Sequence, residues 1–101
     1  MTPEKRVQNQ IMSWLNQLKS EGHPIRIERR QAGGFSYKMG DPDLWCVYNG
    51  IHIEIEVKRE KGGELSVMQE KKIELFKSIN CPYILASSVD DVKNFFEKYI
   101  F

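Results

Sequence analysis

Two carboxylates and one lysine are brought together by a short turn in the middle of this sequence. The Asn-Gly pair at 49–50 has the residue types of a two-residue hairpin loop, which fixes the register of the strands beside it. Counting outward from this turn places Asp43 opposite Glu56, and Lys58 points to the same side. Like charges that face each other across two strands destabilise a hairpin, so a cation is expected between them. The set is suited to metal-dependent hydrolysis of a phosphodiester bond.

Each of the three residues also has a purely structural interpretation. Asp43 closes the Gly-Asp-Pro-Asp sequence at 40–43, where turn formation alone favours Asp. Glu56 can be an exposed strand residue, and Lys58 can form an ion pair with Glu56 or Glu60. Against this, carboxylate oxygens are the hard ligands that Mg²⁺ prefers, and the Lys58 ammonium group can stabilise charge on a phosphate.

The elements that position these residues are predicted by periodicity and by helix caps. Capping residues and apolar spacing predict helices at 2–20, at 66–79 and after 88, and alternation predicts strands at 25–30, 44–48, 51–58 and 81–86. A helix between the third and fourth strands is the crossover expected of a parallel pair. The order αβββαβα predicts one α/β domain over residues 1–101, with a mixed sheet of about four strands flanked by helices.

Apolar side chains at regular spacing mark the surfaces that we expect to be buried. The strand at 81–86 is mostly apolar, which predicts cover on both of its faces. Glu54 is expected to be solvated or in a dimer contact. His52 is expected roughly 13 Å from Glu56, too far to act as a base. The expected inward-facing residues are Val7, Ile11, Trp14, Leu15, Leu18, Leu44, Cys46, Tyr48, Ile51, Ile53, Ile55, Val57, Met68, Leu75, Ile79, Val92, Phe95, Phe96 and Tyr99.

The net charge of +1 does not by itself indicate a nucleic-acid-binding protein. The distribution is more informative, because basic residues precede Asp43 and acidic residues crowd the strand that follows it. The basic group suits a phosphate-binding rim, and a solvated surface is the alternative. A loop expected over 31–40 could contact nucleic acid or cover the edge of the sheet. The basic residues are Arg26, Arg29, Arg30 and Lys38.

The remaining composition predicts a cytoplasmic protein without a membrane segment. No apolar run approaches the roughly 20 residues that span a bilayer, and the N-terminus lacks the apolar core of a signal peptide. Cys46 and Cys81 lack the neighbours of a zinc site and are expected to fill apolar space.

At this point the motifs resemble a known family. Pro-Asp at 42–43 followed by Glu-x-Lys at 56–58 resembles the PD-(D/E)xK nuclease superfamily, and the element order resembles its VRR-NUC branch, the virus-type replication-repair nucleases. That branch has an acidic residue on the first helix, a Gly-x-Pro-Asp-Leu turn, Glu-x-Lys on a strand and Gln on the next helix. The matching residues, over nearly the whole chain, are Glu4, the turn at 40–44, Glu56, Val57, Lys58 and Gln69.

The resemblance implies a restriction-endonuclease-like fold and a metal-dependent endonuclease. Mg²⁺ or Mn²⁺ would be held by Asp43, Glu56 and the carbonyl of Val57. Stand-alone members of the branch resemble homodimers that cut branched DNA such as four-way junctions, so we expect the same here, and such a minimal nuclease suits a phage or a mobile element. The implied catalytic residues are Asp43, Glu56, Lys58, Glu4 and Gln69.

Several alternatives remain open at this point. Glu4 also suits the positive end of a helix dipole, and Gln69 also suits a capping box with Ser66. Gln8 lies one turn beyond Glu4 and could line the same cleft. At the level of function, the alternatives are a nuclease of flaps or single strands, a non-catalytic nucleic-acid-binding module, and an interaction domain without a nucleic-acid partner. The acidic residues disfavour a simple binder, because carboxylates repel phosphate.

Overall fold

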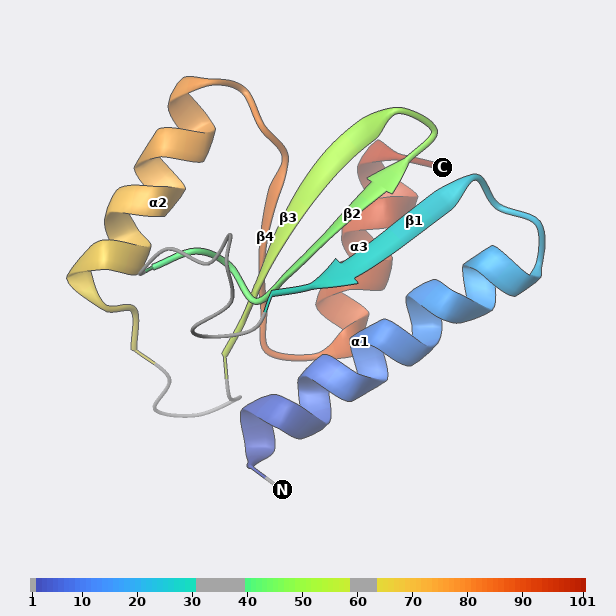
Figure 1. Ribbon diagram of the computed structural model, residues 1–101, viewed down its shortest axis with the longest axis horizontal. Helices are drawn as coiled ribbons and strands as arrows, with labels where there is room; N and C mark the ends of the chain where they lie inside the picture. Colours follow the sequence, from blue (N-terminus) through green and yellow to red (C-terminus); the bar gives the residue numbers. More distant parts are fainter. Residues whose placement is uncertain (1, 31–39, 59–63) are drawn as a thin grey trace.

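A four-stranded mixed sheet carries two helices on one face and one helix on the other (Figure 1). The computed structural model describes residues 2–30, 40–58 and 64–101, so nearly all of the predicted loop over 31–40 lies outside the described residues. No helix in these described ranges is long and apolar enough to cross a membrane. The elements are α1 (Pro3–Ser20), β1 (Ile25–Arg29), β2 (Leu44–Tyr48), β3 (Ile51–Val57), α2 (Val67–Ser78), β4 (Tyr83–Ala86) and α3 (Val89–Tyr99).

The central hairpin has the register that its turn predicts. Asn49 and Gly50 have φ angles of 47° and 85°, the positive values that a type I′ turn requires. Tyr48 therefore pairs with Ile51, and the antiparallel pairing of β2 and β3 continues to Leu44. The sheet order is β1-β2-β3-β4, with β1 antiparallel to β2 and β4 parallel to β3. The predicted mixed sheet and its crossover through α2 are confirmed.

The hydrophobic core lies between one face of the sheet and the helices α1 and α3. Trp14 of α1 packs edge-on against Phe96 of α3, with ring centroids 5.4 Å apart. Both cysteines are free; Cys46 is buried in this core as expected, whereas Cys81 is only partly buried. The buried apolar residues are Ile11, Leu15, Leu18, Ile25, Leu44, Cys46, Ile53, Ile55, Val57, Ile84, Ala86, Val92 and Phe96.

Several expectations about burial are wrong, and one concerns Ile51, which was expected to face inward but is 41% exposed beside the hairpin turn. None of the residues of α2 is buried, so its predicted apolar stripe does not join the core. Tyr99 is 62% exposed, because the stripe of α3 that faces the sheet runs through Val92 and Phe96 and leaves Tyr99 on its flank. Leu85 of β4 is 47% exposed. The strand β4 lies at the edge of the sheet and is fully covered only on the core face.

Gly40 lets the turn before β2 pass directly over the start of α2. Its φ angle is +86°, and a Cβ atom at this position would lie 2.7 Å from the backbone carbon and oxygen of Met68. No real Cβ contact with backbone is this short, so any other residue must displace either the turn or the helix. The glycine therefore fixes the distance between α2 and the segment that carries Asp43.

We expect Gly40→Ala to destabilise the protein by more than about 2 kcal/mol, because it adds a steric clash to the usual cost of a positive φ angle. Gly22→Ala is the matched control, since Gly22 has a φ angle of +96° but open space around the missing Cβ. Urea unfolding of both variants measures the difference. Equal losses of stability in the two variants would show that a Cβ at position 40 does not destabilise the protein through a clash with Met68.

Candidate active site

The carboxylate of Asp43 is held over the end of β3 by main-chain contacts. Its Oδ2 accepts a hydrogen bond from the backbone N–H of Val57 at 3.0 Å. Its own carbonyl oxygen accepts the N–H of Arg30 at 2.9 Å, which continues the β1–β2 pairing beyond β1. Because the N–H and C=O of one strand residue point to the same neighbour, the Val57 carbonyl also points towards the Asp43 side. Asp43, Glu56 and this carbonyl are thus brought to one end of the hairpin.

Glu56 is a buried carboxylate with one unpaired oxygen. Its side chain is 2% exposed. Oε1 accepts a hydrogen bond from Gln69 Nε2 at 2.5 Å and lies 3.8 Å from Lys58 Nζ. Oε2 is also buried, and in the part of the chain that the structure describes it has no hydrogen-bond partner. A buried acceptor without a partner destabilises the folded state, because it has lost its hydrogen bonds to water. This oxygen is therefore available to a ligand from outside the described residues.

Burial and like charge shift the ionisation of both carboxyl groups. Burial and, after it, the charge of Asp43 raise the pKa of Glu56 to about 8, although Lys58 opposes both effects. Burial also raises the pKa of Asp43, against the hydrogen bond from Val57, and the charge of Glu4 adds to the increase. Burial and the neighbouring negative charges disfavour the charged form of both carboxyl groups, and a cation between the groups would favour it.

Two of the residues expected on the helices, Glu4 and Gln69, also reach this site. Glu4, exposed in the first turn of α1, lies close enough for its charge to act on Asp43 and Glu56. Gln8 is buried, and its Oε1 accepts a hydrogen bond from Lys5 Nζ at 3.5 Å. The capping-box alternative for Gln69 is correct, since its Oε1 accepts the N–H of Ser66 at 2.9 Å. The cap and the contact with Glu56 are therefore compatible, because they use different atoms of one side chain.

The donor set fits a hard divalent cation that keeps much of its water. No group of three or more His, Cys, Asp or Glu side chains within the described ranges could hold a metal ion by itself. Two carboxylates and a carbonyl suffice for Mg²⁺, which commonly binds proteins through one or two carboxylates and retains several waters. The unpaired oxygen of Glu56 supports the same fit.

Glu54 is not a solvated or dimer-contact residue, and that expectation is wrong. It is 1% exposed, and Arg30 holds both of its oxygens, with Nη1 at 2.5 Å and Nη2 at 2.9 Å. His52 Nε2 also contacts Oε2 of Glu54, and the His52 ring stacks on Trp45 at 5.2 Å. The pairing was missed because it depends on the register between β1 and β2, which no turn in the sequence specifies.

Tyr83 is a second residue near the site that the sequence did not indicate. It pairs with Glu54 in the parallel ladder between β3 and β4. Its hydroxyl is buried and, as far as the described residues go, has no hydrogen-bond partner. Burial raises the pKa of this hydroxyl, and the charge of Glu56 raises it further. Only the pairing of β4 with β3 could have revealed this proximity.

The predicted basic rim is not one continuous surface in the described part of the chain. Arg26 is exposed and pairs with Glu28 at 3.0 Å, whereas Arg30 pairs with buried Glu54. Arg29 points to the opposite face of the sheet, where its Nη2 donates to Asn9 of α1 at 2.9 Å. Lys38 lies outside the described residues. A role for these four residues in binding DNA stays a prediction.

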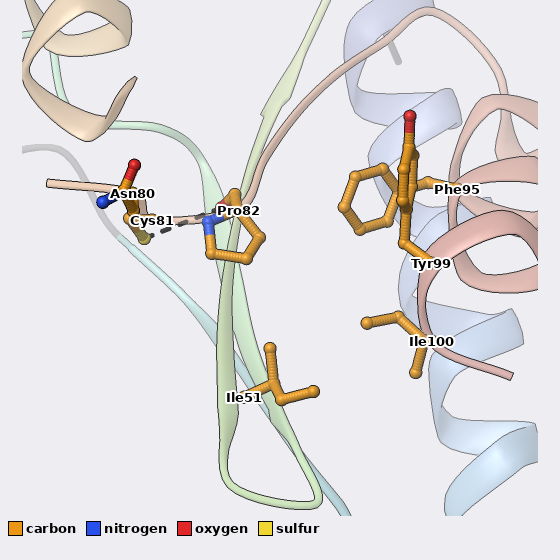
Figure 2. A pocket seen from close by; sticks show the side chains of 7 residues that line it. All are labelled: Ile51, Asn80, Cys81, Pro82, Phe95, Tyr99 and Ile100. Atoms are coloured by element: carbon orange, nitrogen blue, oxygen red, sulfur yellow. Dashed lines mark hydrogen bonds between the residues drawn. The ribbon is translucent and has the colours of Figure 1, made fainter. Parts of the chain in front are cut away.

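A separate hollow of about 490 Å³ lies at the other end of the hairpin. Figure 2 shows Ile51 of β3 and Pro82, just before β4, facing Phe95, Tyr99 and Ile100 of the α3 region. Its lining contains neither Asp43 nor Glu56. The hollow is therefore distinct from the candidate active site.

Comparisons with known proteins relate this fold to one family. Neither the protein-family models nor the curated proteins include a match to the chain. Among solved structures, one described as "VRR_NUC domain" has a TM-score of 0.78 and 22% identity, and the match covers 98% of this chain and 99% of that one. Another, "VRR_NUC domain protein", has a TM-score of 0.73 and 25% identity, with coverage of 99% and 89%. The chain therefore has the fold of VRR-NUC domains over nearly its whole length, and it carries the acidic and lysine motif at the end of the hairpin.

Proposed function

We propose that this protein is a divalent-metal-dependent endonuclease that hydrolyses DNA phosphodiester bonds. The observation that carries the proposal is the buried, unpaired oxygen of Glu56 next to a second carboxylate, Asp43. A protein that only binds nucleic acid gains nothing from two acidic groups directed at phosphate. A nuclease needs them to hold its cation, and Mg²⁺ or Mn²⁺ would be bound by Asp43, Glu56 and the Val57 carbonyl.

The surrounding side chains have separate tasks in this proposal. The bound cation would stabilise charge on the phosphate and make a water molecule more acidic. Lys58 places an ammonium group 3.8 Å from Glu56, where it can orient the attacking water and stabilise charge on the phosphate. Gln69 fixes the orientation of Glu56 through its hydrogen bond, and Glu4 adds negative charge at the edge of the site.

The substrate and the assembly are also part of the proposal. We propose branched DNA such as a four-way junction as the substrate and a homodimer as the active form. A domain of 101 residues offers little surface to hold a branched duplex, and two copies would place two active sites about a two-fold axis. Such an arrangement can cut two strands of one junction.

Asp43→Asn should lose metal-dependent cleavage by at least about 100-fold while it keeps the fold. The amide oxygen of Asn can still accept the hydrogen bond from Val57, but the negative charge is gone. Lys58→Met should retain Mn²⁺ binding and lose most cleavage, because the missing charge acts on the phosphate and water. The assay uses labelled four-way junction, flap, single-stranded and linear duplex DNA with Mg²⁺, Mn²⁺ or EDTA.

Lys98→Met, a change at an exposed lysine in the last turn of α3, is the control and should cut at the wild-type rate. Cleavage that persists in Asp43→Asn or in EDTA would contradict the metal-dependent mechanism. Binding of DNA without cleavage under every condition would indicate a non-catalytic binding module instead.

Glu56→Gln should stabilise the metal-free protein at pH 8.5 by about 2 kcal/mol and have little effect at pH 4.5. The pKa of Glu56 is raised from 4.5 to about 8 in the fold, so the protein binds this proton more tightly than the unfolded chain does. The resulting stabilisation is present below pH 4.5 and is lost as the pH rises through 8. Gln stays neutral at every pH, and urea unfolding in EDTA measures the difference.

Saturating Mn²⁺ at pH 8.5 should reverse this order, because the cation stabilises wild type but has lost a ligand in Glu56→Gln. The exposed residue Glu97 supplies the matched control, and Glu97→Gln should follow wild type in both conditions. If Glu56→Gln gained as much stability from Mn²⁺ as wild type does, Glu56 would not be a metal ligand.

The homodimer is tested by sedimentation equilibrium of the metal-free protein at micromolar concentration. We expect a mass near twice the 11.9 kDa of the chain. A single monomeric species over this concentration range would rule out the dimer, while the nuclease assay would still test the active site.

A further inference from the structure

We propose that the buried pair of Arg30 and Glu54 is a positioning device for the metal site, which holds Asp43 directly before β2. The inference rests on the proposed function, because it takes Asp43 as a metal ligand. It goes beyond that function in assigning a positioning role to two residues that would not touch the cation. The supporting observations are the contacts that the Arg30 side chain and backbone make with the turn before β2.

Arg30 contacts two successive carbonyl groups of the turn that ends at Asp43. Its Nη1 donates a hydrogen bond to the Pro42 carbonyl at 3.0 Å, and its backbone N–H donates to the Asp43 carbonyl at 2.9 Å. The first contact comes from the side chain and the second from the backbone. Together they fix the two peptide groups that flank the α-carbon of Asp43. The direction of the Asp43 side chain follows from this backbone geometry.

Glu54 determines where the Arg30 guanidinium can lie. It binds Nη1 and Nη2 through both of its oxygens, a two-point contact that fixes the plane of the guanidinium group. His52 contacts one of the same oxygens and stacks on Trp45, which limits the rotation of Glu54. The Arg30 side chain is only 19% exposed, so it is not free to turn towards solvent. The Pro42 carbonyl therefore meets a donor with a fixed position.

The energetics of buried ion pairs favour a role in geometry over a role in stability. Removing two charges from water costs about as much free energy as their attraction returns, and well-packed apolar residues often replace such a pair without loss. What an apolar pair cannot supply is a hydrogen bond to the Pro42 carbonyl. The specific contribution of this pair is thus the placement of the turn.

The other end of the same turn is held by α2. Lys72 Nζ lies 3.0 Å from Asp41 Oδ1, and Gly40 packs against the backbone of Met68. Both contacts come from α2, and the charge of Asp41 also acts on Arg30. Loss of the Arg30 contact should therefore release the Asp43 end of the turn while the Gly40 end stays in place.

The decisive variant is the double substitution Arg30→Met/Glu54→Met. Arg30→Met alone leaves the Glu54 charge buried without its partner and should destabilise the whole fold. The double variant removes both charges, so urea unfolding should show stability close to wild type. Isothermal titration should nevertheless show Mn²⁺ binding about 10-fold weaker or more, the range seen when residues that orient metal ligands are lost.

A second measurement reads the position of Asp43 without any metal. The amide proton of Val57 is hydrogen-bonded to Asp43 Oδ2, whereas that of the next residue, Lys58, is bonded to the Ala86 carbonyl of the β4 strand. In EDTA, hydrogen exchange at Val57 should be about 10-fold faster in the double variant than in wild type. Exchange at Lys58 should be unchanged, which makes it an internal control for the strand.

Lys98→Met is the external control, since it removes an exposed basic residue in the last turn of α3. Its Mn²⁺ affinity and Val57 exchange should equal those of wild type. Arg30→Lys serves if the double variant does not fold. Lysine keeps a charge for Glu54, but its ammonium group cannot reproduce the planar contact with Glu54 and also bind the Pro42 carbonyl. It should show the same two changes to a smaller extent.

Wild-type Mn²⁺ affinity and Val57 protection in a stable double variant would overturn the inference, and the pair would then be purely structural. Failure of the proposed function has a different signature. In that case wild type itself would bind no Mn²⁺, while the exchange at Val57 would still decide whether Arg30 and Glu54 position Asp43.

Discussion

Electrostatic repulsion between Asp43 and Glu56 is the constraint on which the site depends. The fold places two carboxylates at one end of a hairpin and then removes most of the water that would screen them. Such an arrangement is tolerated only where neighbouring groups compensate. Gln69 and Lys58 supply part of this compensation to Glu56, and the Val57 N–H supplies it to Asp43. The second oxygen of Glu56 is also buried, and it receives no compensating hydrogen bond from the described residues.

The two faces of the sheet carry different kinds of residue. One face holds the apolar core against α1 and α3, and the other carries the charged residues beneath the turn and α2. The helix α2 adds no buried residue of its own, and its described polar contacts with the site run through Gln69 and Lys72. In Figure 1 it stands beside the β4 edge, apart from the two core helices. The helices α1 and α3 therefore bury the core, whereas α2 contributes mainly polar contacts near the candidate site.

Local signals in the sequence were sufficient for the strands and caps that carry the motif. The Asn49-Gly50 turn alone determined the register of β2 and β3, and hence the position of Asp43 opposite Glu56. The caps of the three helices involve contacts within four residues, so they too could be predicted. The Arg30 and Glu54 pair could not, because it joins β1 to β3 across an intervening strand. The exposure of Tyr99 likewise depends on how a helix is rotated on the sheet.

The alternation along β3 ties the core and the site to the same backbone. Ile53, Ile55 and Val57 point into the core, while Glu54 and Glu56 point to the other face. Because successive side chains change faces, loss or gain of one residue within this strand would exchange the two sets. Glu54 and Glu56 would then enter the core, and isoleucines would take their places on the other face. The strand thus tolerates substitution at single positions far more readily than any change in its length, and variation in length among related chains should concentrate outside it.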